Sequence, residues 1–482
     1  MFLLSGLNSI LAGYPGGYRK HLRGTQKRND PPPFRQPTDP RDRRSRIPAL
    51  GYPEYWYPAL PAADVGTKKP EVLRMLGKDL VFFRNEHGEV KALWDCCPHR
   101  GVYLSNGDCF YNGFITCPYH GATFDGDGNC VAFLTEGPDS RMVGQLKARA
   151  YPTITLLGLV FVWMGEGEPV DPHEDIPPEM FEPHNIYRPS FYMINCNWVL
   201  TLENTMDAHN AFFTHRNALS VLFRNKLGGR ARTPFGYRTQ IVDEHAAHYK
   251  PGEDKAPTAR YYYDEKGEIP YQMYYPGVKG VWPLHRWRLL WAWFFDRRQQ
   301  KQRVEKKGQF SDEARKLDRW NGTCLPGMSR TAGANDTYRD TRWPVPVEES
   351  LCRMVYINVE RYSSPPSPIT RAWKAFTWPV RDWLKNFNFR NQDVWAEQYG
   401  QYDAPEYLSS TDSAVVAMRR LFTEHARGLK PAEPEIAAEA IDEKMVEENE
   451  LKAMESAKGV YAEEIREKLL EEKGKLTPTK PS

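Results

Sequence analysis

Hydrophobic and polar positions alternate in short runs over the first part of the chain. Apolar segments such as 79–83, 114–116 and 156–163 are separated by turns rich in Gly, Asn and Asp, as at 126–129. Short apolar runs bounded by turn residues predict β-strands joined by tight turns. We therefore expect a small antiparallel β domain over residues 49–166.

The pattern changes after a Pro-rich stretch that ends near residue 183. A segment without Gly or Pro then runs from Asn197 to His215, and it predicts a helix. Aromatic runs within 218–380, including Trp343–Pro346, are consistent with a sheet that lines an apolar pocket or with a plain core, and core is our default. These elements make up a second, larger domain at 167–430.

The two ends of the chain have little to bury. Residues 1–48 predict a flexible arm, because the stretch 29–48 is rich in Pro, Asp and Arg. Residues 431–482 are charge-dense, which predicts an exposed helix or a disordered tail. The first thirteen residues are mostly apolar but too few to span a membrane. A membrane-surface anchor or an organelle address stays open.

Charge and cysteine content narrow the class of partner and compartment. The 65 basic and 62 acidic side chains give a formal net charge of +3, which does not favour nucleic acid as a partner. The eight cysteines form no regular framework, which is typical of a reducing compartment, the cytoplasm.

Four residues form the most specific motif. Cys97 and His99 make a Cys-x-His loop, Cys117 and His120 make a Cys-x-x-His loop, and seventeen residues separate His99 from Cys117. Two thiolates and two imidazoles are the ligands of a Rieske [2Fe–2S] cluster, with sulfur on one iron and nitrogen on the other. A zinc site is the alternative, although zinc modules usually pair Cys with Cys and His with His.

The motif resembles the Rieske proteins, and within them the oxygenase and ferredoxin branch. The respiratory-chain branch carries an extra cysteine in each loop, and the two form a disulfide. This sequence has Val102 and Tyr119 where those cysteines would fall.

A second cluster of polar residues resembles the mononuclear-iron helix of Rieske non-haem iron oxygenases. Asn204, Asp207 and His215 fit the pattern Asn-x-x-Asp-x-x-His-x-x-x-x-His, but the first histidine is expected at position 210, where the sequence has His209 and then Asn210. On a regular helix one residue means about 100° of rotation. We favour His209 as the ligand because imidazole suits Fe(II) better. Asn210 as an oxygen ligand, or an altered iron site, stays open.

The resemblance also implies a third iron ligand and a bridging acid. Asp393, followed by Glu397 one helical turn later, resembles the family's late acidic motif and would complete a 2-His-1-carboxylate set. Asp207 would hydrogen-bond an iron-ligand histidine, and it would also contact His120 of the adjacent chain in a homotrimer.

The resemblance implies an α+β fold, with the Rieske domain followed by a catalytic domain whose antiparallel sheet is flanked by helices. Its implied activity is to pass electrons through the [2Fe–2S] cluster to a mononuclear Fe(II) site. That site uses O₂ to hydroxylate, demethylate or dihydroxylate a hydrophobic small molecule. No Gly-x-Gly-x-x-Gly segment is present, so the electrons of NAD(P)H must come through a separate reductase, a ferredoxin or both.

Two other function classes stay in play. An electron carrier would use only the cluster, and a zinc-stabilised module would use no iron. The stretches 282–307 and 369–389 mix Trp and Phe with Arg and Lys, which is typical of basic amphipathic helices. Contact with a membrane surface is one interpretation, but we favour solvated helices that pack on the domain.

Overall fold

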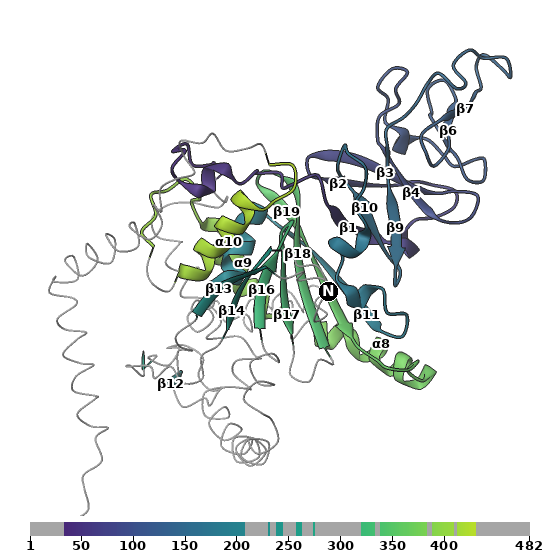
Figure 1. Cartoon of the computed structure of the whole chain (residues 1–482). Coiled ribbons are helices and arrows are strands. Elements are labelled where there is room, and N and C mark those ends of the chain that lie inside the picture. Colours follow the sequence, from purple (N-terminus) through teal and green to yellow (C-terminus); the bar gives the residue numbers. More distant parts are fainter. Residues whose placement is uncertain are drawn as a thin grey trace, which may run out of the picture.

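The computed structural model confirms the α+β fold. It describes residues 33–207, 230–231, 238–243, 257–262, 273–274, 320–332, 338–382, 388–408 and 412–429. Figure 1 shows a small all-β domain at one side of a long twisted sheet, and helices α9 (Asn388–Tyr399) and α10 (Ser413–Glu424) lie at the other side.

The β domain is built from three small antiparallel sheets. The first has the order β1 (Trp56–Pro61), β10 (Leu159–Trp163), β9 (Thr153–Leu156). The second has the order β2 (Glu71–Met75), β3 (Lys78–Arg84), β4 (Val90–Trp94), β8 (Ala150–Tyr151). The third is β5 (Ile115–Thr116), β6 (Ala122–Phe124), β7 (Cys130–Phe133). Short 3-10 turns lie at Arg43–Arg46, Ala62–Asp64, Leu104–Asn106, Pro172–Glu174 and Pro178–Met180.

One predicted strand is in fact a hairpin. The apolar run 156–163 spans the end of β9, a turn at Leu157 and Gly158, and then β10. Leu157 and Gly158 have φ of +48° and +84°. Two consecutive residues with positive φ make the tight turn that joins antiparallel strands. The hydrophobic run hides this turn because only one of its two residues is Gly.

The larger domain is organised around a seven-stranded antiparallel sheet. Its order is β11 (Ile186–Ile194), β19 (Leu351–Glu360), β18 (Tyr338–Glu348), β17 (Met328–Ala332), β16 (Trp320–Cys324), β14 (Pro257–Tyr262), β13 (Arg238–Asp243). The short strands β12 (Arg230–Ala231) and β15 (Met273–Tyr274) pair separately. The remaining described helices are α3 (Trp198–Met206) and α8 (Pro368–Asp382).

Helix α3 begins where predicted but ends earlier. The Asn197 side chain accepts a hydrogen bond from the backbone N–H of Val199 and caps the helix. Asp207, the C-terminal cap, has φ −81° and ψ +83°, which are not helical. The prediction of one regular helix over 197–215 is therefore wrong. Because the backbone leaves the helix at Asp207, a rotation of 100° per residue cannot be used to choose between His209 and Asn210 as the iron ligand.

A shared hydrophobic core joins the two domains. Trp343 of β18 is fully buried, and its ring lies 6.1 Å from that of Tyr57 and 6.3 Å from that of Phe161, both in the β domain. Backbone hydrogen bonds from Leu76 and Gly77 to β18 add to this contact. The default interpretation of Trp343 as core, rather than as the lining of a pocket, is confirmed.

A buried charge cluster ties α10 to α3. The Arg419 guanidinium lies 2.7 Å from a carboxylate oxygen of Glu203 and 2.5 Å from one of Glu406, and Arg419 is only 4% exposed. Burial raises the pKa of Glu203, although the positive charge of Arg419 opposes that shift. The position of α3 therefore depends on a charge that arrives from α10.

Replacement of this arginine should weaken the fold. Arg419→Met keeps a side chain of similar length but leaves the Glu203 carboxylate buried without that cation. This should lower the free energy of unfolding by about 3–5 kcal/mol. Urea denaturation measures the loss. Arg41→Met is the control, because the Arg41–Asp39 pair is exposed and should add nothing measurable. Equal losses in the two variants would contradict the buried-charge argument.

Candidate metal centres

The two predicted cluster loops have the same backbone structure. In each loop the cysteine N–H donates to the carbonyl five residues later, from Cys97 to Val102 and from Cys117 to Ala122, both at 2.8 Å. The glycine four residues after each cysteine returns a hydrogen bond to the cysteine carbonyl, at 2.8 and 3.1 Å. Two loops with different ligand spacing therefore close in the same way.

The four predicted donors come together as two pairs. Cys97 and Cys117 are both buried, and a hydrogen bond from Cys97 lowers the pKa of Cys117 to about 6. The rings of His99 and His120 lie 4.7 Å apart at 74° to each other. Sulfur is thus paired with sulfur and imidazole with imidazole, which is the division that a Rieske cluster requires.

One nitrogen in this group has the character of a metal ligand. The Nδ1 atom of His120 is buried and has no hydrogen-bond partner among the described residues. Leaving a buried polar atom unpaired is costly unless another group binds it. No three His, Cys, Asp or Glu side chains in the described part of the chain surround one point, and a cluster with two protein ligands on each iron needs no such triplet. The donors fit a [2Fe–2S] cluster.

The second loop is held more tightly than the first. Gly121 has φ +70°, and a Cβ atom there would lie 2.6 Å from Cβ of Leu134. The N–H of Leu134 also donates to the carbonyl of Gly121, and that of Thr135 to the carbonyl of His120. Gly101 has φ +75°, but a Cβ atom there would meet nothing within 4 Å.

Helices α3 and α9 meet through one buried carboxylate. Glu397 is 6% exposed and accepts from Nδ2 of Asn204 at 3.1 Å and from Oγ1 of Thr201 at 3.3 Å. Asn204 was predicted as a site residue, and the structure shows that it holds Glu397. Thr201 was missed, although it lies one turn before Asn204 on the same helical face.

The same contact gives the relative direction of α3 and α9. Near the start of α3, Leu200 lies 3.7 Å from where a Cβ atom of Gly400 would be, while Asn204 further along α3 contacts Glu397. The helices are therefore antiparallel. Asp393 lies one turn before Glu397 on α9, so this register carries it toward the end of α3, where Asp207 lies. Asp393 is half-buried.

The predicted iron ligands are only partly described. Of the ligands, Asp393 is described and lies within α9, while Asp207, the predicted bridging acid, caps the C-terminal end of α3. His209, Asn210 and His215 lie outside the described residues, so their assignment stays a prediction.

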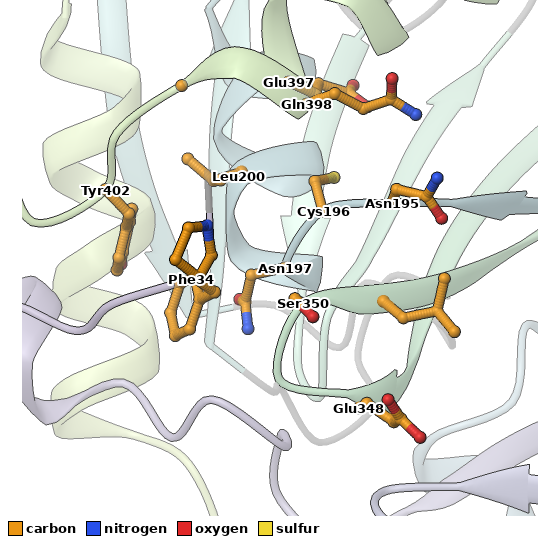
Figure 2. A pocket seen from close by; sticks show the side chains of 13 residues that line it. Phe34, Asn195, Cys196, Asn197, Leu200, Glu348, Ser350, Glu397, Gln398 and Tyr402 are labelled. Carbon is orange, nitrogen blue, oxygen red and sulfur yellow. The ribbon is translucent and has the colours of Figure 1, made fainter. Parts of the chain in front are cut away.

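A cavity of about 300 Å³ lies beside this helix pair, near the opposite end of α3. Figure 2 shows Glu397 and Cys196 at its lining, with Leu200 and Tyr402 at another side. Asn, Gln, Glu and Ser side chains make up much of the wall. None of its lining residues belongs to the aromatic runs that are consistent with the lining of an apolar pocket or with core.

Comparison with known proteins agrees with both halves of this geometry. Residues 55–150 match the Rieske [2Fe-2S] domain, and residues 163–430 match a family described as homotrimeric ring hydroxylase. The chain resembles the terminal oxygenase component of carbazole 1,9a-dioxygenase from Metapseudomonas resinovorans, with 25% identity over 79% of this chain and 92% of that protein. Dicamba O-demethylase from Stenotrophomonas maltophilia is 34% identical over 33% of this chain and 47% of that protein.

A solved structure has the same fold. The terminal oxygenase of carbazole 1,9a-dioxygenase from Nocardioides aromaticivorans IC177 matches with a TM-score of 0.60 and 24% identity, over 79% of this chain and 96% of that one. The domain and site define a Rieske oxygenase, an oxidoreductase with a [2Fe–2S] cluster and a mononuclear iron. The chain belongs to the homotrimeric ring hydroxylase family. The zinc module is therefore wrong, because the Rieske match covers the same four donors.

The tighter second loop gives a testable difference. Gly121→Ala must place Cβ against Leu134 as well as adopt a positive φ, whereas Gly101→Ala pays only the backbone strain of about 1 kcal/mol. Iron and acid-labile sulfide per chain should therefore fall well below wild type in Gly121→Ala. The Gly101→Ala control should stay close to wild type. Equal cluster content in both variants would contradict this account of the loop.

Proposed function

We propose that this chain is the terminal oxygenase of a multicomponent system that oxidises a hydrophobic organic substrate by hydroxylation, demethylation or dihydroxylation. The observation that carries the proposal is the antiparallel contact of α3 and α9 through Glu397, because it directs Asp393 and Asp207 to the same end of the helix pair. The names of the relatives, a carbazole dioxygenase and a dicamba demethylase, support a hydrophobic organic substrate.

Each predicted ligand has a role in this proposal. Cys97 and Cys117 hold one iron of the cluster, and His99 and His120 hold the other. When bound, the cluster supplies single electrons and the mononuclear Fe(II) supplies the chemistry with O₂. We assign the iron ligands to His209, His215 and Asp393, with Asn210 as the alternative to His209.

The remaining site residues orient the ligands. Asp207 accepts a hydrogen bond from an iron-ligand histidine and so fixes the direction of its ring. The same carboxylate faces His120 of the adjacent copy in the homotrimer. Asn204 and Thr201 hold Glu397, and Glu397 keeps the Asp393 end of α9 against α3.

The rest of the chain supports this role. We place the Rieske domain at 49–166 and the catalytic domain at 167–430, between an arm at 1–48 and a charged tail at 431–482. Among the described helices none is long and apolar enough to cross a membrane. None of the eight cysteines, all of which lie in the described residues, forms a disulfide, which supports a reducing compartment, the cytoplasm. A ferredoxin, a reductase or both deliver the electrons of NAD(P)H, and the solved complexes of the carbazole 1,9a-dioxygenase oxygenase with ferredoxin support a ferredoxin as partner.

Iron analysis tests the second metal site. The wild type should contain about three irons per chain, two in the cluster and one at the mononuclear site. Asp393→Asn should reduce this to about two and leave the visible absorption of the cluster unchanged, because only one ligand set is altered. Asp403→Asn, an exposed acid just beyond α9, is the control. About two irons per chain in the wild type would instead support a simple electron carrier.

Asp207 should act on turnover rather than on metal content. Asp207→Ala removes the proposed link between the two centres, so both metals should stay bound while O₂ uptake and product formation fall at least ~100-fold. The assay uses ferredoxin, reductase and any substrate that the wild type oxidises, and Asp403→Ala is the control. Full activity of Asp207→Ala would remove this role.

A further inference from the structure

The described part of the N-terminal arm lies against the catalytic domain. Figure 1 shows it, in purple, beside α10 and far from β6 and β7 of the cluster sheet. Phe34 stacks on Tyr402, with the two ring centroids 5.3 Å apart, and Figure 2 shows both residues at the lining of the cavity. We call residues 34–49 the arm segment.

The arm segment contacts the helices of the proposed iron site at several points. The carbonyl of Pro48 accepts a hydrogen bond from the Trp198 indole, and that of Ala49 accepts one from the Asn197 side chain. Both donors lie at the start of α3. Arg43 forms an ion pair with the end of α10. One short stretch of chain therefore touches helices that are far from it in the sequence.

Arg44 makes the largest number of these contacts and is only 5% exposed. Its guanidinium donates to the carbonyl of Tyr402 at 2.8 Å and to that of Ala404 at 3.1 Å. These carbonyls come just after α9, which ends at Tyr399. The Asp42 carboxylate lies 2.6 Å from the same guanidinium and balances its charge. Arg44 thus holds the chain at the point where it leaves α9.

Arg44 also reaches α3, through two further charged side chains. Its Nε atom lies 3.7 Å from Oε2 of Glu406, and the same oxygen lies 2.5 Å from the guanidinium of Arg419. Arg419 forms the buried ion pair with Glu203 of α3. Glu203 lies four residues, about one turn, before Asp207. A series of charges of alternating sign therefore runs from the arm segment to the helix that ends at Asp207.

These contacts require a guanidinium. Its planar fork donates in several fixed directions, so it binds two carbonyls and two carboxylates together, whereas a lysine ammonium is a point charge on a flexible stem. The regions that match the Rieske and ring hydroxylase families begin at residues 55 and 163. Arg44 lies before both, so its role does not follow from membership of the family.

We propose that Arg44 is a positioning residue for the mononuclear iron site. It holds the end of α9 through backbone acceptors, and it holds α3 through Glu406 and Arg419. Asp393 and Asp207 thereby keep one position relative to each other. The iron site itself rests on the proposed function, but the support of the two helices by Arg44 does not.

Arg44→Lys in the full-length holoenzyme tests this role, because it keeps the positive charge and loses the fork. Turnover should fall at least ~tenfold while the visible absorption of the cluster stays unchanged, since a displaced ligand set costs rate. The electron paramagnetic resonance spectrum of the ferrous enzyme with nitric oxide reports the geometry of the mononuclear iron, and its line shape should change. A residue that only stabilises the fold would leave this spectrum unchanged in the folded, iron-loaded protein.

Hydrogen–deuterium exchange gives a second readout, which needs no iron. Peptides from α3 and α9 should exchange at least ~threefold faster in Arg44→Lys, because local opening costs less when the helices lose a support. Peptides from β6 and β7 should not change. Arg41→Lys is the matched control, because Arg41 lies on the same arm segment and pairs with Asp39 on the surface. It should equal the wild type in both measurements.

A variant that fails to fold would leave a second way to test the role. Gln36→Ala then replaces Arg44→Lys, because the Gln36 amide donates to carbonyls of the arm segment and holds the turn that carries Arg44. Wild-type exchange in α3 and α9 would overturn the proposal, as would a wild-type spectrum with nitric oxide. A wild type without mononuclear iron would contradict the proposed function instead, and the exchange rates would still decide whether Arg44 holds the helices.

Discussion

The shared core around Trp343 is the constraint on which the arrangement of the two metal centres depends. The β domain contributes Tyr57 and Phe161 to this core, and backbone hydrogen bonds from the β2–β3 turn reinforce it. Closely packed cores do not slide, so the sheets of the β domain that carry Tyr57 and Phe161 keep one position relative to the catalytic sheet. A β domain fixed in this way does not swing its cluster loops toward the catalytic sheet of its own chain, and the family to which the chain belongs is homotrimeric.

The catalytic domain depends in the same way on a smaller contact, the one between α3 and α9. Glu397 is buried, and two neutral donors from α3 satisfy it. This carboxylate joins two helices that are far apart in the sequence, and Arg419 of α10 forms an ion pair with Glu203 of the same α3. Asp207 and Asp393, the acids of the proposed iron site, are therefore positioned by other carboxylates and amides of the same helices.

The cluster could be predicted because its ligands, glycines and turns are local in the sequence. The end of α3 could not, since no Gly or Pro marks it and Asp207 is an ordinary helical residue by composition. Likewise the spacing of apolar residues in α8 predicts a helix but does not tell which face of that helix packs on the protein. Only the hydroxyls of β11 and the carboxylate of Glu360 show that its polar side faces inward.

The clamp between α3 and α9 has a consequence for how the enzyme matures. The cluster ligands lie on two neighbouring loops with their own small core, so they can assemble early. Asp207 and Asp393, the acids of the proposed second site, are far apart in the sequence, and they come to the same helix pair only when α9 has docked on α3. A chain that stalled in between would hold the cluster but lack the proposed second site. The visible absorption of a preparation then measures its cluster content, but it does not measure the fraction of molecules that are active.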